Sequence, residues 1–464
     1  MNQPFDDTVY TPDTVVAIAA AAPGSAVSIV RLSGGGALEI TTAVFTAKNG
    51  ADPRNQKGYT CLLGTVHDGA EPIDTVVLTV FRAPKSYTGE DMAEFSCHGG
   101  LFIAGCVLDA AVKQGARLAG PGEFTKRAFL NGKISLSQAE AVQNLIAAGN
   151  KQALKQSLAA EGGSVKRAID SLSDRLVSLT ADLMAWIDFP EEDVPAADMA
   201  AIRVELIDIK AKLDELCESY DTHRLAANGV DTVIAGGPNV GKSTLMNLLC
   251  GREKSIVTPI PGTTRDVVEE TISLGGVTLR LSDTAGIRES ADLIEQLGIG
   301  KSMEKISNSQ LVLAVFDGSA PLSPDDLKLM DLLADTPAIA VINKCDLPQA
   351  VDRKLIESKL SKTVAISAKT GENIAALEEA VAEMFKLHEL DPSMAILQTA
   401  RQNECATRAA KSCATAIEAI ASHVPPDAVS VLLDETIAAL FELEGKNVSA
   451  AVVDEIFARF CVGK

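Results

Sequence analysis

The chain has 464 residues, more than one hydrophobic core usually serves, so two to four domains are expected. Its apolar content of 47% and charged content of 22% are those of an ordinary globular protein, and no apolar run approaches the roughly 20 residues of a bilayer span. The formal charge of −20 argues against a surface coated with phosphate-binding Lys and Arg. Nine cysteines without a Cys-x-x-Cys pair predict neither a disulfide framework nor a zinc site, and Met1 to Tyr10 lack a signal-peptide pattern. We expect a cytoplasmic protein in which any RNA contact is local.

The first part of the chain has short β-rich runs broken by glycines and prolines, at Val15–Ile18, Val27–Leu32 and Val76–Phe81. This texture predicts a small α/β domain over residues 1–131. After Asn131 it changes, and Ser137 with Glu140 predicts a capping box at a helix start.

Helical periodicity then occupies two separated blocks, 132–225 and 386–464. In the first, apolar residues recur at spacings of three and four from Val165 to Ile187, and in the second they recur from Ala409 to Leu440. The block between them, 226–385, alternates apolar strands with helices. The simplest architecture is one discontinuous helical domain with an inserted α/β domain, because chain termini that lie close together tolerate insertion. Two separate helical domains are the alternative.

The inserted block contains a phosphate-loop pattern. Strand Thr232–Ala235 is followed by Gly236–Ser243 and then at once by a helix. Glycines let backbone N–H groups close around phosphates, and the helix N-terminus adds positive potential. Lys242 should reach the β- and γ-phosphates as a catalytic cation, and the Ser243 hydroxyl should ligate Mg²⁺. The other contacts expected here come from Asn239, Val240, Gly241 and Thr244.

Three further loops follow strands in the order that a guanine-nucleotide site requires. Strand Val277–Ser282 leads into Asp283, Thr284, Ala285 and Gly286, which would hold the metal's water shell and approach the γ-phosphate. Asn343, Lys344 and Asp346 follow Ala338–Ile342, and Ser367, Ala368 and Lys369 follow another strand. The Asp346 carboxylate can accept both N1–H and the amine of guanine, whereas adenine offers neither donor. The site therefore predicts GTP rather than ATP, with discrimination of roughly 10⁴-fold.

Other motifs resemble a known family. Gly262-Thr-Thr-Arg-Asp266 resembles the TrmE, Era and EngA group of bacterial GTPases. Pro121 to Lys133, Ser86 to Asp91, the inserted GTPase order and the terminal Cys461-Val-Gly-Lys464 narrow the resemblance to the MnmE (TrmE) family of tRNA modification GTPases. It implies an N-terminal α/β folate-binding domain, a discontinuous helical domain and an inserted Ras-like GTPase domain with a mixed sheet.

The resemblance assigns cation roles to the loop between the first two nucleotide motifs. Thr264 would join Ser243 on Mg²⁺, and K⁺ would be held by Asn239, Thr258, Ile260 and Thr263. Pro259, Pro261 and Gly262 would complete this loop against GTP. Ile287 stands where Ras-like enzymes place the water-orienting Gln, so Glu295 would take that role; without the resemblance it would be a solvated helix carboxylate.

The resemblance also implies a tetrahydrofolate site made by Arg31, Glu94, Lys133 and Lys464, for a 5-formyl or 5,10-methylene form. Arg31 and Lys133 would otherwise be surface charges, and Cys461 to Lys464 a frayed tail. With the tail at the folate, Cys461 would act as a nucleophile or proton donor.

The implied function is a K⁺-dependent GTPase. As a homodimer acting with the flavoprotein MnmG on tRNA, it would install a (carboxymethyl)aminomethyl group at C5 of the wobble uridine. One rival is a regulatory GTPase of ribosome assembly or of a membrane, without one-carbon chemistry. Another is a folate-dependent transferase with a vestigial GTPase domain, against which the intact nucleotide loops argue.

Overall fold

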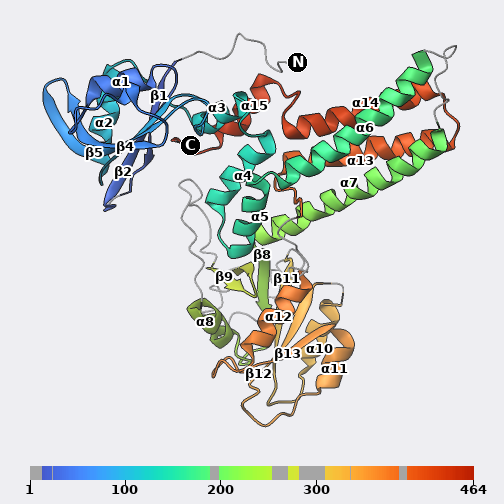
Figure 1. Cartoon of the computed structure of the whole chain (residues 1–464). Helices are drawn as coiled ribbons and strands as arrows, with labels where there is room; N and C mark the ends of the chain where they lie inside the picture. Colours follow the sequence, from blue (N-terminus) through green and yellow to red (C-terminus); the bar gives the residue numbers. More distant parts are fainter. Residues whose placement is uncertain are drawn as a thin grey trace. The chain divides into compact units, whose positions relative to one another are not determined.

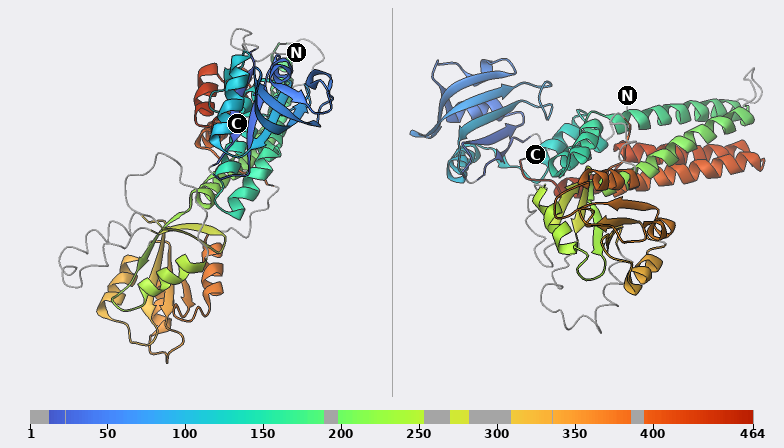
Figure 2. Two further views of the ribbon diagram at one scale, coloured as in Figure 1. Left: turned by 90° about the vertical axis from the view of Figure 1, so that its left-hand side faces the viewer. Right: turned by 90° about the horizontal axis from the view of Figure 1, so that it is seen from below.

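The computed structural model describes residues 13–22, 24–188, 198–252, 270–281, 309–334, 336–385 and 394–463. The chain divides into two compact units, which are described separately. The first comprises Met1–Gln143, Lys166–Ile207 and Arg408–Lys464, and the second comprises Asn144–Val165 and Asp208–Thr407. Figures 1 and 2 show the elements of both, coloured along the sequence.

The N-terminal part of the first unit is a seven-stranded sheet. Its strands are β1 (Val15–Ala20), β2 (Val27–Ser33), β3 (Phe45–Ala47), β4 (Thr60–Asp68), β5 (Glu71–Phe81), β6 (Met92–His98) and β7 (Arg117–Leu118). The order is β3-β4-β5-β6-β2-β1-β7, with only the β1–β7 pair parallel. The predicted N-terminal α/β domain is confirmed.

One face of this sheet is covered by helices α1 (Ala37–Val44) and α2 (Leu101–Lys113), whose apolar side chains pack on alternate strand residues such as Val30 and Leu78. A short 3-10 helix, η1, spans Pro53–Asn55. Helix α3 (Glu123–Leu130) contributes Phe124 to a second, smaller cluster with Val15 and Met92. The helices therefore leave part of the second face open.

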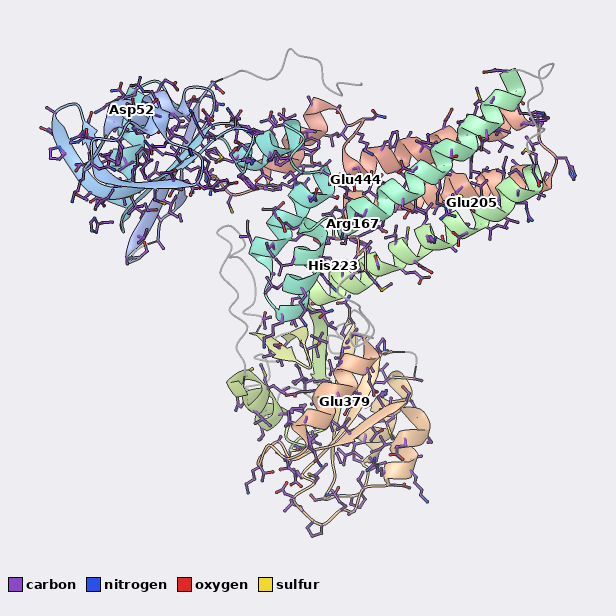
Figure 3. All side chains as sticks on the ribbon, viewed as in Figure 1. Asp52, Arg167, Glu205, His223, Glu379 and Glu444 are labelled. Carbon is purple, nitrogen blue, oxygen red and sulfur yellow. The ribbon has the colours of Figure 1, made fainter. Side chains whose placement is uncertain are left out.

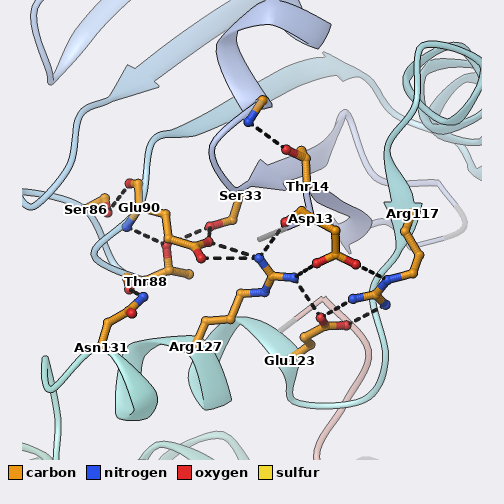
Figure 4. Close-up of polar contacts among 11 residues, drawn as sticks. Asp13, Thr14, Ser33, Ser86, Thr88, Glu90, Arg117, Glu123, Arg127 and Asn131 are labelled. Carbon is orange, nitrogen blue, oxygen red and sulfur yellow. Dashed lines mark hydrogen bonds and ion pairs between the residues drawn. The ribbon is translucent and has the colours of Figure 1, made fainter. Parts of the chain in front are cut away.

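A polar cluster fixes α3 on the sheet (Figure 4). The Arg127 side chain is only 4% exposed and donates hydrogen bonds to Asp13, Glu90 and Glu123. Arg117 on β7 pairs with Asp13 and Glu123 as well. Burial raises the pKa of Glu90, and the charge of Arg127 only partly opposes this. Because Arg127 is buried and paired with all three carboxylates, removing its guanidinium would leave Glu90 and Glu123, which are 14% and 16% exposed, without a buried counter-charge.

The helical blocks consist of α4 (Leu136–Ala147), α5 (Lys151–Glu161), α6 (Ser164–Asp188), α7 (Met199–Asn228), α13 (Ala400–Ala421), α14 (Pro426–Glu444) and α15 (Ala450–Ala458). Contacts join the two blocks inside the first unit. Ser137 donates to Glu444 at 2.9 Å, Lys446 pairs with Asp170 at 2.9 Å, and Cys413 Sγ donates to the Leu206 carbonyl. The discontinuous helical domain is confirmed.

The predicted capping box at Ser137 is wrong. The reciprocal pair is Ser135 with Gln138: the Ser135 N–H donates to Gln138 Oε1, and the Gln138 N–H donates to Ser135 Oγ. Ser137 is instead buried and donates a hydrogen bond to Glu444 of α14. A long-range contact thus takes the hydroxyl that the local pattern assigned to the cap.

The second unit carries a six-stranded mixed sheet. Its strands are β8 (Val230–Ala235), β9 (Glu270–Leu274), β10 (Val277–Leu281), β11 (Leu311–Asp317), β12 (Ala338–Asn343) and β13 (Lys362–Ala365). The order is β13-β12-β11-β8-β10-β9, parallel except for β9 against β10. The predicted mixed sheet is confirmed.

Helices cover both faces of that sheet (Figure 1). On one face, α8 (Lys242–Arg252) and α12 (Ile374–Met384) pack on Ile234, Leu313 and Val341. On the other, α10 (Pro324–Leu332) and α11 (Arg353–Lys359) pack on Val312 and Ala340. Since both faces are covered, ligands are expected at the carboxyl edge of the strands. Among the helices in the described ranges, none is long and apolar enough to cross a bilayer.

Candidate functional site: a nucleotide edge and a docked tail

The predicted phosphate loop lies at the carboxyl end of β8. Its backbone needs unusual conformations: Gly236 and Gly241 have φ of 151° and 101°, and Asn239 has 61°. A Cβ on Gly236 would lie 2.4 Å from the Val315 carbonyl oxygen, and one on Gly241 would lie 2.2 Å from Asn343 Nδ2. Glycine is therefore required at both positions.

Lys242 begins α8 and folds over this loop. Its Nζ donates to the carbonyls of Gly236 and Gly237 at 2.8 and 2.6 Å, and burial lowers the pKa of the amine. An anion bound in the loop would stabilise the protonated Lys242 amine and raise its pKa again. Asn239, Ser243 and Thr244 are exposed around it. The Lys242 amine fits the phosphates of a nucleotide, and the Ser243 hydroxyl oxygen can ligate Mg²⁺.

Asn343, at the end of β12, joins two loops. Its Nδ2 donates to the Val240 carbonyl at 2.8 Å, and its Oδ1 accepts from the Ala368 N–H at 2.9 Å. The side chain is buried, with 3% exposure. The phosphate loop and the Ser367–Lys369 loop are thus held by one amide, a role that the sequence motif did not reveal.

Lys344 follows with φ of 66° and is paired with Asp317 of β11 at 2.5 Å. Burial pushes the pKa of Asp317 upward, but hydrogen bonds from Lys344 and Ser319 outweigh it and hold the pKa below its usual value. Asp317 was missed at the sequence level. Its position at the end of a parallel strand beside β12 was the available signal. Asp346 is exposed, where it can meet a base.

Several predicted site residues lie outside the described residues, so their roles stay predictions. They are Thr258, Pro259, Ile260, Pro261, Gly262, Thr263, Thr264, Asp283, Thr284, Ala285, Gly286, Glu295 and Lys464. The described strands end close to them along the chain: β10 ends at Leu281, two residues before Asp283.

The predicted folate residues are only partly brought together. Arg31 and Glu94 are register partners on β2 and β6, with Nε to Oε1 at 2.7 Å and both side chains 20% exposed. Arg31 also lies over the rings of Tyr87 and Phe124, and its Nη1 donates to the Gly463 carbonyl. Lys133 donates instead to the Pro84 carbonyl at 2.8 Å. Carboxylate, guanidinium and aromatic rings in one place fit a pterin-like ring.

The C-terminal tail is ordered against the same domain. The Gly122 N–H donates to the Cys461 carbonyl at 3.2 Å, and Val462 forms a β-bridge with Pro121. Cys461 is exposed, while Gly463 is buried. The tail as far as Gly463 is therefore docked rather than frayed.

Comparison with known proteins agrees with this arrangement. The MnmE helical domain matches residues 136–461, and the GTP-binding protein TrmE N-terminus matches residues 14–133. The tRNA modification GTPase MnmE of Acetivibrio thermocellus is 38% identical over 98% of this chain and 100% of the relative. That of Thermoanaerobacter pseudethanolicus is 38% identical over 97% and 99%.

Among solved structures, the G domain of the T. maritima FeoB iron transporter is 27% identical. It covers 33% of this chain and 98% of that domain, with a TM-score of 0.25, and no structural conclusion follows at that score.

The phosphate loop on β8, the Asn343 link and the covered mixed sheet define a GTPase of the phosphate-loop class. The two domain matches and the full-length relatives make the identification specific. The chain belongs to the MnmE family.

Proposed function

We propose that the chain hydrolyses GTP to GDP and phosphate in order to modify tRNA. The observation that carries this is the amide of Asn343, which ties the phosphate loop to the Ser367–Lys369 loop at 2.8 and 2.9 Å. A site built this way holds phosphates and base in one geometry, and positioning of this kind supplies most of the catalysis in phosphoryl transfer.

Within this site, the proposed roles follow the residue chemistry. Lys242 neutralises β- and γ-phosphate charge, Ser243 and Thr264 hold Mg²⁺, and Glu295 orients the attacking water. K⁺ would be bound by Asn239, Thr258, Ile260 and Thr263. The cation offsets charge that develops between the phosphates, which an arginine finger does in other GTPases.

The tRNA reaction is proposed to be installation of a (carboxymethyl)aminomethyl group at C5 of the wobble uridine, with the flavoprotein MnmG as partner. Tetrahydrofolate would supply the one-carbon unit. Glu94 would bind the N–H edge of the pterin, while Lys133 and Lys464 would bind the carboxylates of its glutamate tail. We place the domains at 1–131, 132–225 with 386–464, and 226–385.

We further propose that the protein is a homodimer through the N-terminal sheet. Leu63 and Val77 are direct cross-strand partners, 51% and 40% exposed, and Val27 of β2 is 54% exposed. All three point to the face opposite the core that α1 and α2 cover. A second copy of the same sheet face would bury these side chains.

The proposed K⁺ dependence is tested by GTP hydrolysis under multiple turnover in KCl and in NaCl at equal ionic strength. We expect a rate in KCl at least about tenfold higher, because one tenfold step corresponds to only about 1.4 kcal/mol of transition-state stabilisation. Glu295→Ala should slow hydrolysis in KCl while nucleotide affinity is retained. Equal hydrolysis rates in the two salts would contradict the proposed K⁺ site.

A further inference from the structure

The last described residues, Cys461–Gly463, are held on the N-terminal domain through their own backbone atoms. Phe460 is 6% exposed and packs on Phe457, with ring centroids 5.0 Å apart. Beyond it, the chain is held through the Cys461 carbonyl, the Val462 bridge and the Gly463 carbonyl. Tail placement therefore depends on how closely two backbones can approach.

Gly463 sits where no side chain fits. Its φ is 92°, and a Cβ would lie 2.5 Å from the Ile18 carbonyl oxygen and 2.9 Å from Ala19 Cα. Both are backbone atoms of β1, which pairs with β2 and β7 and cannot move aside cheaply. An alanine here would combine a strained φ with a clash.

Gly122 is the matching position on the domain side. Its φ is 62°, and a Cβ would lie 2.8 Å from both the Phe457 carbonyl oxygen and Phe460 Cβ. Gly122 precedes α3, which the Arg127 cluster locks to the sheet (Figure 4). The donor that holds Cys461 is therefore on a rigid support.

We propose that Gly122 and Gly463 form a clamp whose function is to fix the tail beside the Arg31–Glu94 pair. Arg31 is then a positioning residue for the tail, since one guanidinium nitrogen binds Glu94 and another binds the Gly463 carbonyl. Cys461 is only two residues upstream, at most about 7 Å of chain. The clamp thereby holds the thiol within reach of the candidate folate residues, an inference that rests on the proposed function.

The clamp is tested by proteolysis of the full-length protein. Arg459 is exposed, with a side-chain exposure of 72%, so trypsin can release Phe460–Lys464 once the tail leaves its site. Release measured by mass spectrometry tracks the undocked population when reclosing is fast. Gly463→Ala should speed release about tenfold or more, and Gly122→Ala should do the same.

Gly50→Ala is the matched control, because Gly50 lies in the same domain with φ of 73° but has no atom within 4 Å of an added Cβ. It should release the peptide at the wild-type rate. GTP hydrolysis should be unchanged in all three variants, whereas wobble-uridine modification in cells should fall in Gly463→Ala and not in Gly50→Ala.

Wild-type release rates in Gly463→Ala would overturn the clamp. Faster release with normal tRNA modification would overturn its positioning role. Failure of the proposed function itself would be seen separately, as normal wobble uridines in a strain that lacks the protein altogether.

Discussion

At the scale of single residues, the two ends of the Asn343–Asp346 motif do different work. Asn343 is buried and joins the phosphate loop to the Ser367–Lys369 loop, whereas Asp346 is exposed and available to the base. Asn343 therefore holds the two loops together, and we propose that Asp346 selects the nucleotide.

Substitutions should separate these roles. Asn343→Ala leaves a buried carbonyl and a buried N–H without their partner, so we expect a loss of about 3 kcal/mol in stability and weaker binding of every nucleotide. Asp346→Asn swaps an acceptor for a donor and should shift preference from GTP to xanthosine triphosphate at unchanged stability. Competition against a fluorescent nucleotide measures both. Unchanged GTP affinity in Asp346→Asn would remove Asp346 from the base site.

The positions of the phosphate loop, Asn343–Asp346 and Ser367–Lys369 after their strands could be predicted from residue order, whereas Asp283–Gly286 lies outside the described residues and stays a prediction. The hydrogen bonds of Asn343 and the ion pair between Lys344 and Asp317 could not be predicted. Each joins segments that only the order of the strands in the sheet brings together. Likewise, the family resemblance predicts a ligand contact for Arg31, whereas its hydrogen bond to the Gly463 carbonyl is seen only in the fold.

At the scale of elements, a buried histidine joins α5 and α7 in the second unit (Figure 3). His223 is 3% exposed, its Nδ1 lies 2.6 Å from Gln156 Oε1, and burial lowers its pKa to about 4. In the unfolded chain the imidazole has its ordinary pKa of 6.5 and takes up a proton near that pH. The folded form is thus penalised wherever only the unfolded form is protonated.

This gives a pH prediction with a definite sign. The contribution of His223 is fully present above pH 6.5 and is lost as pH falls toward 4, by up to about 3 kcal/mol. The free energy of unfolding, measured with denaturant, should fall over that pH window more for the wild type than for His223→Leu. A parallel pH dependence in wild type and His223→Leu would contradict the burial argument.

Helix boundaries show why local patterns mislead at contacts between elements. Ser137 matched a capping pattern, yet Glu444, 307 positions away, takes its hydroxyl, and Ser135 with Gln138 makes the cap. The apolar spacing of α6 was reliable, because residues such as Ile169, Leu176 and Leu183 are buried as predicted. Apolar spacing along a helix therefore predicts which residues are buried, whereas a single polar side chain can form its hydrogen bond with a residue far away in the sequence.

At the scale of the whole molecule, the chain order places a nucleotide unit inside a helical domain whose last helix leads into the docked tail. Insertion was predictable because helical periodicity stops and resumes around the α/β block. The docked tail was not, since it rests on glycine backbones that carry no apolar pattern. The central claim is that GTP turnover in the inserted domain supports tRNA modification by the rest of the chain.

That claim is tested most directly by mass spectrometry of tRNA nucleosides from cells whose only copy carries Lys242→Ala. Lys242 donates to the phosphate-loop carbonyls and belongs to the second unit, whereas the candidate folate residues belong to the first, so the substitution leaves those residues unchanged. We predict loss of the C5-modified wobble uridine, equal to that of a deletion strain. Wild-type levels of the modified uridine in Lys242→Ala cells would show that GTP turnover is not required and would contradict the account.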